Sequence, residues 1–105
     1  MISRTKLFRI IKDTVVSIEP TASLILFGSY ARNENKKDSD VDLLILLDRS
    51  ELTRNDVNRI KYPLYDIEFE TGKIISPIVF TKDDWQKKHS ITPFFENVSR
   101  EGILL

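Results

Sequence analysis

Residues 41–47 (VDLLILL) constrain the fold of this chain more than any other segment. Except for Asp42, every side chain in the segment is apolar. Because successive side chains of a strand point to opposite faces of the sheet, this strand would be apolar on both faces. Strands of that kind are buried between layers of helices. The segment therefore predicts an α/β or α+β protein in which helices flank a mixed sheet.

The other apolar segments supply the remaining elements of such a fold. Apolar residues recur either at helical spacing or in short runs bounded by turn residues. We expect helices at 4–18, 82–89 and 93–101, strands at 23–27 and 74–80, and a brief helical turn at 29–33. Pro77 cannot donate a backbone hydrogen bond, which favours an edge position or a bulge for its strand. The expected result is a single small domain, residues 1–105, with a sheet of three to four strands.

The segment 53–71 fits two patterns. Val57, Ile60 and Leu64 have helical spacing, and Gly72 is suited to end a helix. However, apolar and acidic residues alternate over 65–70 (YDIEFE), as in a half-exposed strand. We favour a helix that Pro63 breaks or kinks.

Composition excludes several classes of protein. The chain has 16 basic and 16 acidic residues, so its net charge of zero gives no strong case for nucleic acid as a partner. It has no cysteine, which excludes disulfides and thiolate metal sites. No apolar run is long enough for a membrane span, and no segment resembles a signal peptide. We expect a soluble cytoplasmic domain.

Two aspartates stand at the start of the 41–47 strand. Asp40 and Asp42 would share one face of the strand, with their Cβ atoms about 6 to 7 Å apart. Two carboxylates about 5 Å apart repel by roughly 3 kcal/mol at an effective dielectric constant of about 20. A divalent cation with oxygen ligands, such as Mg²⁺, would remove this repulsion. Taken alone, however, the pair is better explained by a turn residue, Asp40, followed by a solvent-facing Asp42.

The context of the pair changes that interpretation. Gly28 and Ser29 directly follow the 23–27 strand and open the expected helical turn. Glycine permits close approach of the backbone, and free N–H groups at a helix start favour anions such as phosphate. Alone, this dipeptide would be an ordinary tight turn. If the 23–27 and 41–47 strands are neighbours, the turn and the carboxylates share one end of the sheet, which suits nucleotide chemistry.

These residues carry a family resemblance. The segment 28–32 (GSYAR), a polar loop and the segment 39–43 (SDVDL) resemble the signature of the minimal nucleotidyltransferases, G-S-x-A-R-G followed by S-D-x-D-L. That group belongs to the DNA polymerase β-like nucleotidyltransferase superfamily. The signature covers about 20 of the 105 residues, and the expected order of helices and strands agrees with the family over most of the chain.

The resemblance implies a Mg²⁺-dependent transfer of a nucleoside monophosphate, AMP from ATP, to a protein or small-molecule acceptor, with release of pyrophosphate. The implied nucleotide-binding residues are Gly28, Ser29, Arg32 and Ser39, and the implied catalytic and metal-binding residues are Asp40 and Asp42. Gly28 and Ser29 would hold the β- and γ-phosphates. Arg32 would support the loop or the phosphates, and Ser39 would orient the start of the strand.

The chain departs from the family pattern at two positions. Asn33 replaces the last glycine of the first motif, a mild change because asparagine tolerates the left-handed conformation. The family's third carboxylate belongs on the strand that aligns with 74–80, where Ser76 takes its place. Glu68 or Glu70 could substitute for it only if their segment were a strand. Nucleotide and metal binding are therefore better supported than turnover.

The resemblance also suggests a partner. Minimal nucleotidyltransferases are commonly paired with a helical HEPN-type protein in toxin–antitoxin systems, where the partner can be the acceptor. A second copy of the chain could also complete the acceptor site. The alternative is a weakened nucleotide-binding or partner-binding module that has lost catalysis. A sugar-nucleotide glycosyltransferase also uses an Asp-x-Asp motif, but it needs a much longer chain and gives Gly28 no role.

Several other residues have simpler interpretations. We expect His89 to be an exposed residue at a helix end and Trp85 to anchor the 82–89 helix on the sheet. Tyr30 could either stack near a nucleotide or pack within its loop. The apolar C-terminal residues 94–95 and 103–105 should be mostly core, and any exposed remainder could form a partner interface.

Overall fold

The strand at 41–47 lies inside a sheet, as its apolar pattern predicts. In the computed structural model, which describes residues 2–105, the sheet is accompanied by five helices. In chain order the elements are α1 (Arg4–Ile18), β1 (Ser23–Phe27), α2 (Gly28–Ala31), β2 (Val41–Leu47), α3 (Arg54–Thr71), β3 (Ile75–Thr81), α4 (Lys82–Lys87), α5 (Pro93–Glu101) and β4 (Ile103–Leu104). Every predicted element is present, with its ends shifted by a few residues at most, and only β4 was not expected.

The sheet is mixed and has the strand order β3-β2-β1-β4. β1 runs antiparallel to both β2 and β4, whereas β2 and β3 are parallel. β3 is an edge strand, which confirms the position that Pro77 predicts, because its missing N–H does not face a further strand. The predicted α+β fold class and the mixed sheet are confirmed.

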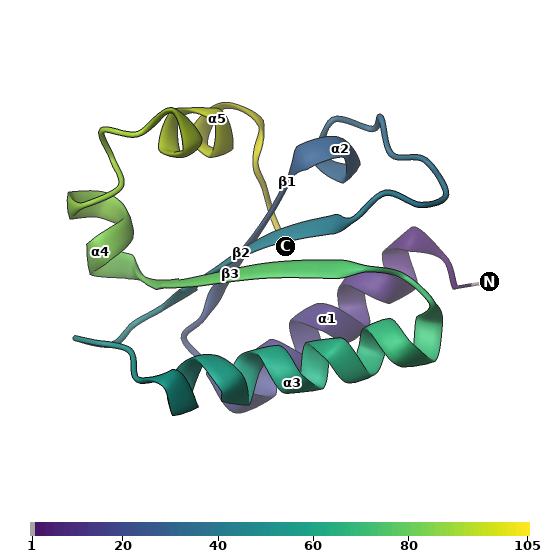
Figure 1. Cartoon of the computed structure of the whole chain (residues 1–105), viewed down its shortest axis with the longest axis horizontal. Helices are drawn as coiled ribbons and strands as arrows, with labels where there is room; N and C mark the ends of the chain where they lie inside the picture. Colours follow the sequence, from purple (N-terminus) through teal and green to yellow (C-terminus); the bar gives the residue numbers. More distant parts are fainter. Residues whose placement is uncertain (1) are drawn as a thin grey trace.

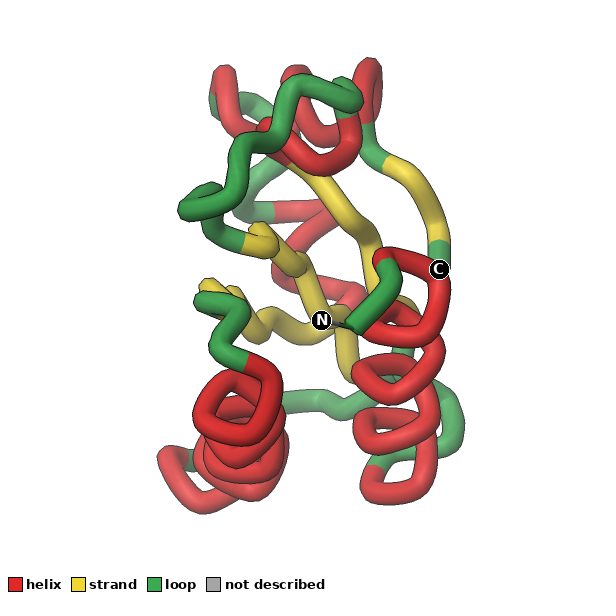
Figure 2. Tube along the Cα trace, turned by 90° about the vertical axis from the view of Figure 1, so that its right-hand side faces the viewer, coloured by secondary structure: helices red, strands yellow, loops and turns green. Residues whose placement is uncertain are grey.

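Helices lie on both faces of the sheet, as Figures 1 and 2 show. α1 and α3 pack side by side on one face, and α4 and α5 lie on the other. Leu43 and Ile45 of β2 contribute to the core under α1 and α3, whereas Leu44 and Leu46 face a second cluster with Trp85 and Val98. The apolar residues at every position of β2 but one are thus explained by two separate cores.

The ambiguous segment is a helix, and the strand alternative is wrong. α3 continues through Pro63 without a break. Ile60, Leu64 and Ile67 are buried on one side of it, while Phe69 is 91% exposed. Packing of the helical stripe against α1 and the sheet therefore outweighs the local alternation of apolar and acidic residues. Thr53 and Asp56 form a capping box at its start, and the left-handed Gly72 ends it.

The C-terminal part of the chain corrects two expectations. Ile103 and Leu104 are 42% and 72% exposed, because β4 is an edge strand. His89 is half-buried rather than exposed, since its ring stacks on Phe80 with the centroids 4.1 Å apart. Trp85, only 3% exposed, anchors α4 as expected. None of the helices in residues 2–105 is both long and apolar enough to cross a membrane.

Candidate active site

The register of β1 and β2 brings the two motifs together. Phe27, the last residue of β1, pairs with Asp42 on the antiparallel β2. Gly28, the next residue, begins α2, so the turn and the aspartates lie at the same end of the sheet. In Figure 1 this end of the sheet lies at the right, below α2. The juxtaposition that the sequence predicts for neighbouring strands is confirmed.

Gly28 is required at this position for two reasons. Its φ of +73° lies in the left-handed region that side chains disfavour. A Cβ atom at Gly28 would also overlap the carboxylate oxygen Oδ2 of Asp42. The first residue of the turn and the second aspartate are therefore in direct contact through the backbone of Gly28.

The Asp42 carboxylate lies in an environment that opposes negative charge. Burial raises the pKa of Asp42, the nearby Asp40 carboxylate raises it further, and Arg32 opposes the shift. Asp40 accepts a hydrogen bond of 3.2 Å from the Ser76 hydroxyl. Two neighbouring carboxylates whose repulsion Arg32 only partly offsets suit a hard divalent cation, so the residues fit Mg²⁺ as a two-carboxylate site.

Ser76 occupies the position predicted for the missing third acid. On the parallel strand β3 it pairs directly with Asp42, and therefore lies on the same face of the sheet. Glu68 does not compensate, because it belongs to α3 on the opposite face and accepts the Ile75 N–H at 2.8 Å. Glu70 is also in α3. Within residues 2–105, no three acidic or histidine side chains gather closely enough to surround a metal ion.

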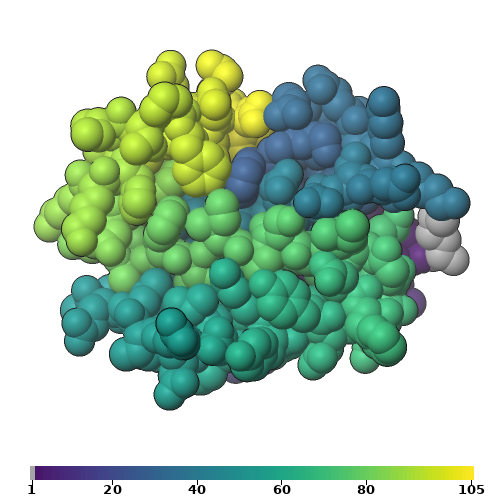
Figure 3. All heavy atoms as spheres, viewed as in Figure 1, coloured from purple at the N-terminus to yellow at the C-terminus, as the bar shows by residue number. Residues whose placement is uncertain are grey.

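Arg32 and Ser39 organise the loop between the two motifs. Arg32 forms ion pairs with Glu34 at 3.3 Å and with Glu101 of α5 at 3.0 Å. The Ser39 hydroxyl accepts the Lys36 N–H at 2.7 Å and so closes the turn before β2. Figure 3 shows the blue atoms of this region beside the yellow atoms at the C-terminal end of the chain. Arg32 thus ties the loop to α5.

Two contacts of the site, those that Arg4 and Glu101 make with the loop, were not predicted from the sequence. Arg4 of α1 donates hydrogen bonds to the loop at Tyr30, Asn33 and Asn35. Tyr30 itself is 4% exposed and packs in the core, which resolves its role as loop packing. Arg4 and Glu101 lie far from the motif in sequence, and no local pattern indicates their contacts with it.

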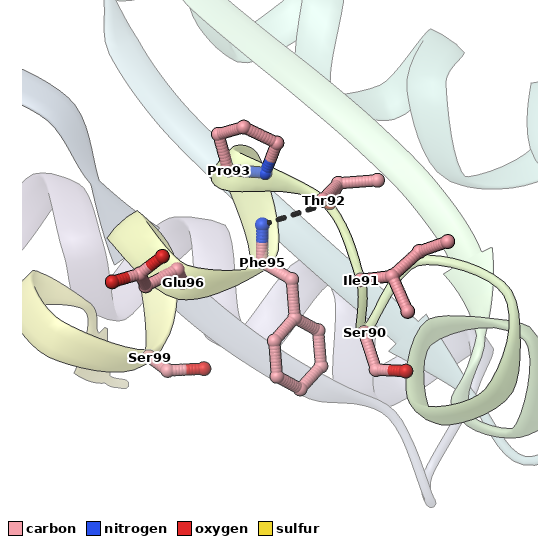
Figure 4. Close-up of a pocket in the computed structure, with 7 residues that line it drawn as sticks. All are labelled: Ser90, Ile91, Thr92, Pro93, Phe95, Glu96 and Ser99. Carbon is pink, nitrogen blue, oxygen red and sulfur yellow. Dashed lines mark hydrogen bonds between the residues drawn. The ribbon is translucent and has the colours of Figure 1, made fainter.

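One hollow of the surface lies away from the motif residues. A cavity of about 400 Å³ is lined by Ser90, Ile91, Thr92, Pro93, Phe95, Glu96 and Ser99 (Figure 4). These residues belong to α5 and the connection that precedes it, and none is a motif residue. The arrangement of carboxylates, rather than cavity volume, therefore identifies the candidate site.

Comparison with known proteins agrees with this site. Residues 8–96 match the family described as the nucleotidyltransferase domain. The chain belongs to that family. It is 35% identical over 81 residues to the Methanocaldococcus jannaschii protein named "Putative protein adenylyltransferase MJ0141", a match that covers 76% of this chain and 74% of that protein.

Solved structures show the same fold. A chain of a toxin–antitoxin crystallised with AMP-PNP has a TM-score of 0.61 and 15% identity, over 98% of this chain and 72% of that one. A chain from a point mutant of the toxin–antitoxin MntA-HpeT has a TM-score of 0.57 and 16% identity, over 100% of this chain and 72% of that one. At such identities the likeness establishes the fold of this nucleotidyltransferase.

Proposed function

We propose that this nucleotidyltransferase transfers AMP from ATP to an acceptor, with Asp40 and Asp42 as the catalytic and metal-binding residues. The observation that carries the proposal is the contact of Gly28 with Asp42, which joins the turn to the carboxylates. The adenylyl group is supported by the name of the Methanocaldococcus relative and by the AMP-PNP with which a structural neighbour was crystallised.

Each motif residue has a role in this proposal. Gly28 and Ser29 bind the β- and γ-phosphates through backbone N–H groups and the serine hydroxyl. Arg32 and Ser39 hold the loop that carries them. When held by Asp40 and Asp42, Mg²⁺ supplies positive charge that neutralises the triphosphate and polarises the α-phosphorus.

The transfer is a single displacement. An acceptor oxygen forms a bond to the α-phosphorus, the bond from that phosphorus to the oxygen leading to the β-phosphate breaks, and pyrophosphate leaves. Ser76 cannot take up the proton of the acceptor hydroxyl at neutral pH, so this proton passes to water or to a base that the acceptor supplies. Among residues 2–105, no third acidic side chain joins Asp40 and Asp42, which predicts slow turnover unless the acceptor supplies a base.

We propose a protein acceptor, of the helical HEPN type, with this chain in an antitoxin-like role in the cytoplasm. Both structural neighbours come from toxin–antitoxin pairs, which supports a partner protein. The 1–105 domain would then bring the nucleotide site and the partner would bring the acceptor residue. Completion of the acceptor site by a second copy is the competing arrangement.

The second candidate function is binding without catalysis. Ser76 favours it, because the hydroxyl satisfies Asp40 but leaves the described part of the site with only two acids. In this case the chain would bind a nucleotide or a partner and neutralise that partner without modifying it.

Calorimetric titration with AMP-PNP, with and without Mg²⁺, tests the proposed site. We expect Mg²⁺-dependent binding by the wild type that is lost in the Asp40→Asn/Asp42→Asn double variant. Absence of binding by the wild type would contradict the proposal. Transfer of label from α-³²P-ATP to a co-purified partner then separates the two candidates, since a binding module leaves the partner unlabelled.

A further inference from the structure

The short helix α2 cannot be stable on its own. It has only four residues, Gly28–Ala31, whereas isolated helices need about 12 to 15 residues to be even marginal in water. Its carbonyl groups must find partners outside the helix. The Arg32 N–H donates to the Gly28 carbonyl, and the Glu34 N–H donates to the Ser29 carbonyl at 2.9 Å. The carbonyl of Tyr30 is approached by the Asn33 N–H only at the longer distance of 3.4 Å.

Arg4 supplies the strongest partner of that last carbonyl. Its Nη2 atom donates to the Tyr30 oxygen at 2.6 Å, across 26 positions of the sequence. Its Nη1 atom donates to the side-chain Oδ1 atoms of Asn33 at 3.3 Å and Asn35 at 3.2 Å. One guanidinium group from α1 therefore binds the end of α2 and the loop that follows it.

Aromatic rings hold this guanidinium in place. Its Cζ atom lies 5.2 Å from the ring centroid of Phe8 and 5.6 Å from that of Tyr30, and the two rings pack edge to face. Among residues 2–105, the salt bridges do not include Arg4. Arg4 thus directs its donors to one loop and keeps its positive charge, which also favours the carbonyl end of a helix.

We propose that Arg4 is a positioning residue for the nucleotide-binding turn. It acts through the backbone of Tyr30 and the side chain of Asn33, and sets the orientation of Gly28 and Ser29 relative to Asp42. The proposal rests on the proposed nucleotide site and extends it to a residue outside the motif.

The same contact explains the departure of Asn33 from the motif. Asn33 has a φ of 59°, the left-handed conformation for which glycine is the usual choice. Asparagine adopts it at modest cost and adds the amide oxygen that accepts the Arg4 bond. Replacement of Asn33 by glycine would keep the backbone but lose this hydrogen bond.

The test combines Arg4→Ala, Asn33→Gly and the double variant, with Arg9→Ala as the matched control. Arg9 is an exposed arginine of the same helix, so its loss makes the same change in charge. Two quantities are measured on the full chain: the affinity for AMP-PNP with Mg²⁺, and hydrogen exchange at the Arg32, Asn33 and Glu34 amides. A melting curve for each variant identifies general destabilisation.

We expect Arg4→Ala to weaken AMP-PNP binding roughly ten- to a hundredfold, the usual cost of removing a supporting residue behind a binding site. Exchange of the three amides should become at least about tenfold faster, because a charged hydrogen bond is lost. Asn33→Gly should weaken binding in the wild type but not in the Arg4→Ala background, since the two residues act through one contact. Arg9→Ala should change neither quantity.

Unchanged amide exchange in Arg4→Ala would overturn the proposal, as would faster exchange with unchanged AMP-PNP affinity. If Arg4→Ala and Asn33→Gly weaken AMP-PNP binding additively, the two residues do not act through one shared contact. If the wild type binds no AMP-PNP, the proposed nucleotide site is wrong, and the exchange data separately decide whether Arg4 orders the turn. If Arg4→Ala does not fold, Asn33→Gly and Arg4→Lys carry the same comparison.

Discussion

At the scale of single residues, the carboxylate of Asp42 destabilises the free protein. Burial and the charge of Asp40 raise its pKa, so the folded state binds a proton more tightly than the unfolded chain. A raised carboxyl pKa means that the stability of the fold increases as the pH falls through it, and that the penalty applies to the ionised carboxylate. The residue proposed to bind Mg²⁺ is thus one that the fold tolerates rather than needs.

Asp42→Asn should therefore raise the melting temperature of the metal-free protein at pH 7, because it removes the buried charge and its repulsion with Asp40. The difference from the wild type should disappear below about pH 4, where both side chains are neutral. Added Mg²⁺ should stabilise the wild type but not the variant. Asp38→Asn, in the exposed loop before β2, is the control for charge alone. A lower melting temperature for Asp42→Asn at pH 7 would contradict this account.

Ser76 is the second residue on which the chemistry depends. Ser76→Asp would place a carboxylate beside Asp42 and near Asp40, with which the serine now shares a hydrogen bond of 3.2 Å. We expect Mg²⁺ affinity to rise roughly tenfold, since added ligand charge strengthens such sites, and the metal-free protein to become less stable. Calorimetric titration with Mg²⁺ measures the first effect. Ser76→Ala, which removes only the hydrogen bond, should show no gain in affinity; equal affinities for the two variants would refute the expectation.

At the scale of elements, the start of α3 depends on its capping box. The Asp56 carboxylate accepts the Thr53 N–H at 3.0 Å, which is the largest cause of its lowered pKa. A lowered carboxyl pKa contributes stability above the unfolded value, and this is lost as the pH falls below about 4. Arg49, at 3.4 Å from Asp56, adds to the shift.

Thr53→Ala should lower the free energy of unfolding by about 1 kcal/mol at pH 7, because the Asp56 N–H loses its partner. From pH 7 to pH 3, the free energy of unfolding should fall less in Asp56→Asn than in the wild type, because the asparagine side chain does not titrate. Urea unfolding at pH 7 and at pH 3 measures both variants. Asp66→Asn, a substitution at an exposed position inside the same helix, serves as the control. If the free energy of unfolding falls by the same amount from pH 7 to pH 3 in the wild type and in Asp56→Asn, then protonation of Asp56 does not contribute to the loss of stability.

At the scale of the whole molecule, β2 belongs to two cores. Leu43 contributes to the core under α1 and α3, and Leu44 to the core under α4 and α5; both are fully buried. Loss of either core would affect the site. Asp42 is itself the second residue of β2, and Glu101 of α5 forms an ion pair with Arg32 of the loop.

Leu43→Ala and Leu44→Ala should therefore each cost about 2 to 5 kcal/mol in the free energy of unfolding, by urea titration. A sheet with one open face would show this cost for only one of them. Ile103→Ala, on the exposed edge strand β4, is the control and should cost little. A small cost for Leu44→Ala would mean that α4 and α5 do not close the second core.

The elements and the motif could be predicted from the amino-acid sequence alone. The apolar residues of 41–47 indicate a doubly buried strand, the spacing of Ile60, Leu64 and Ile67 indicates a helix, and the motif residues indicate the chemistry. These signals are local, because each depends on residues within one or two turns or along one strand. For this reason the order of elements from α1 to α5, the fold class and the family were predicted correctly.

How these parts meet depends on the tertiary structure. The pairing of Phe27 with Asp42, the ion pair between α5 and Arg32 and the hydrogen bonds of Arg4 join residues far apart in sequence. The edge strand β4 and the stacked His89 were missed for the same reason, since exposure depends on which neighbours a segment finds in space. Long-range contacts are set by packing of the whole chain, and no local pattern contains them.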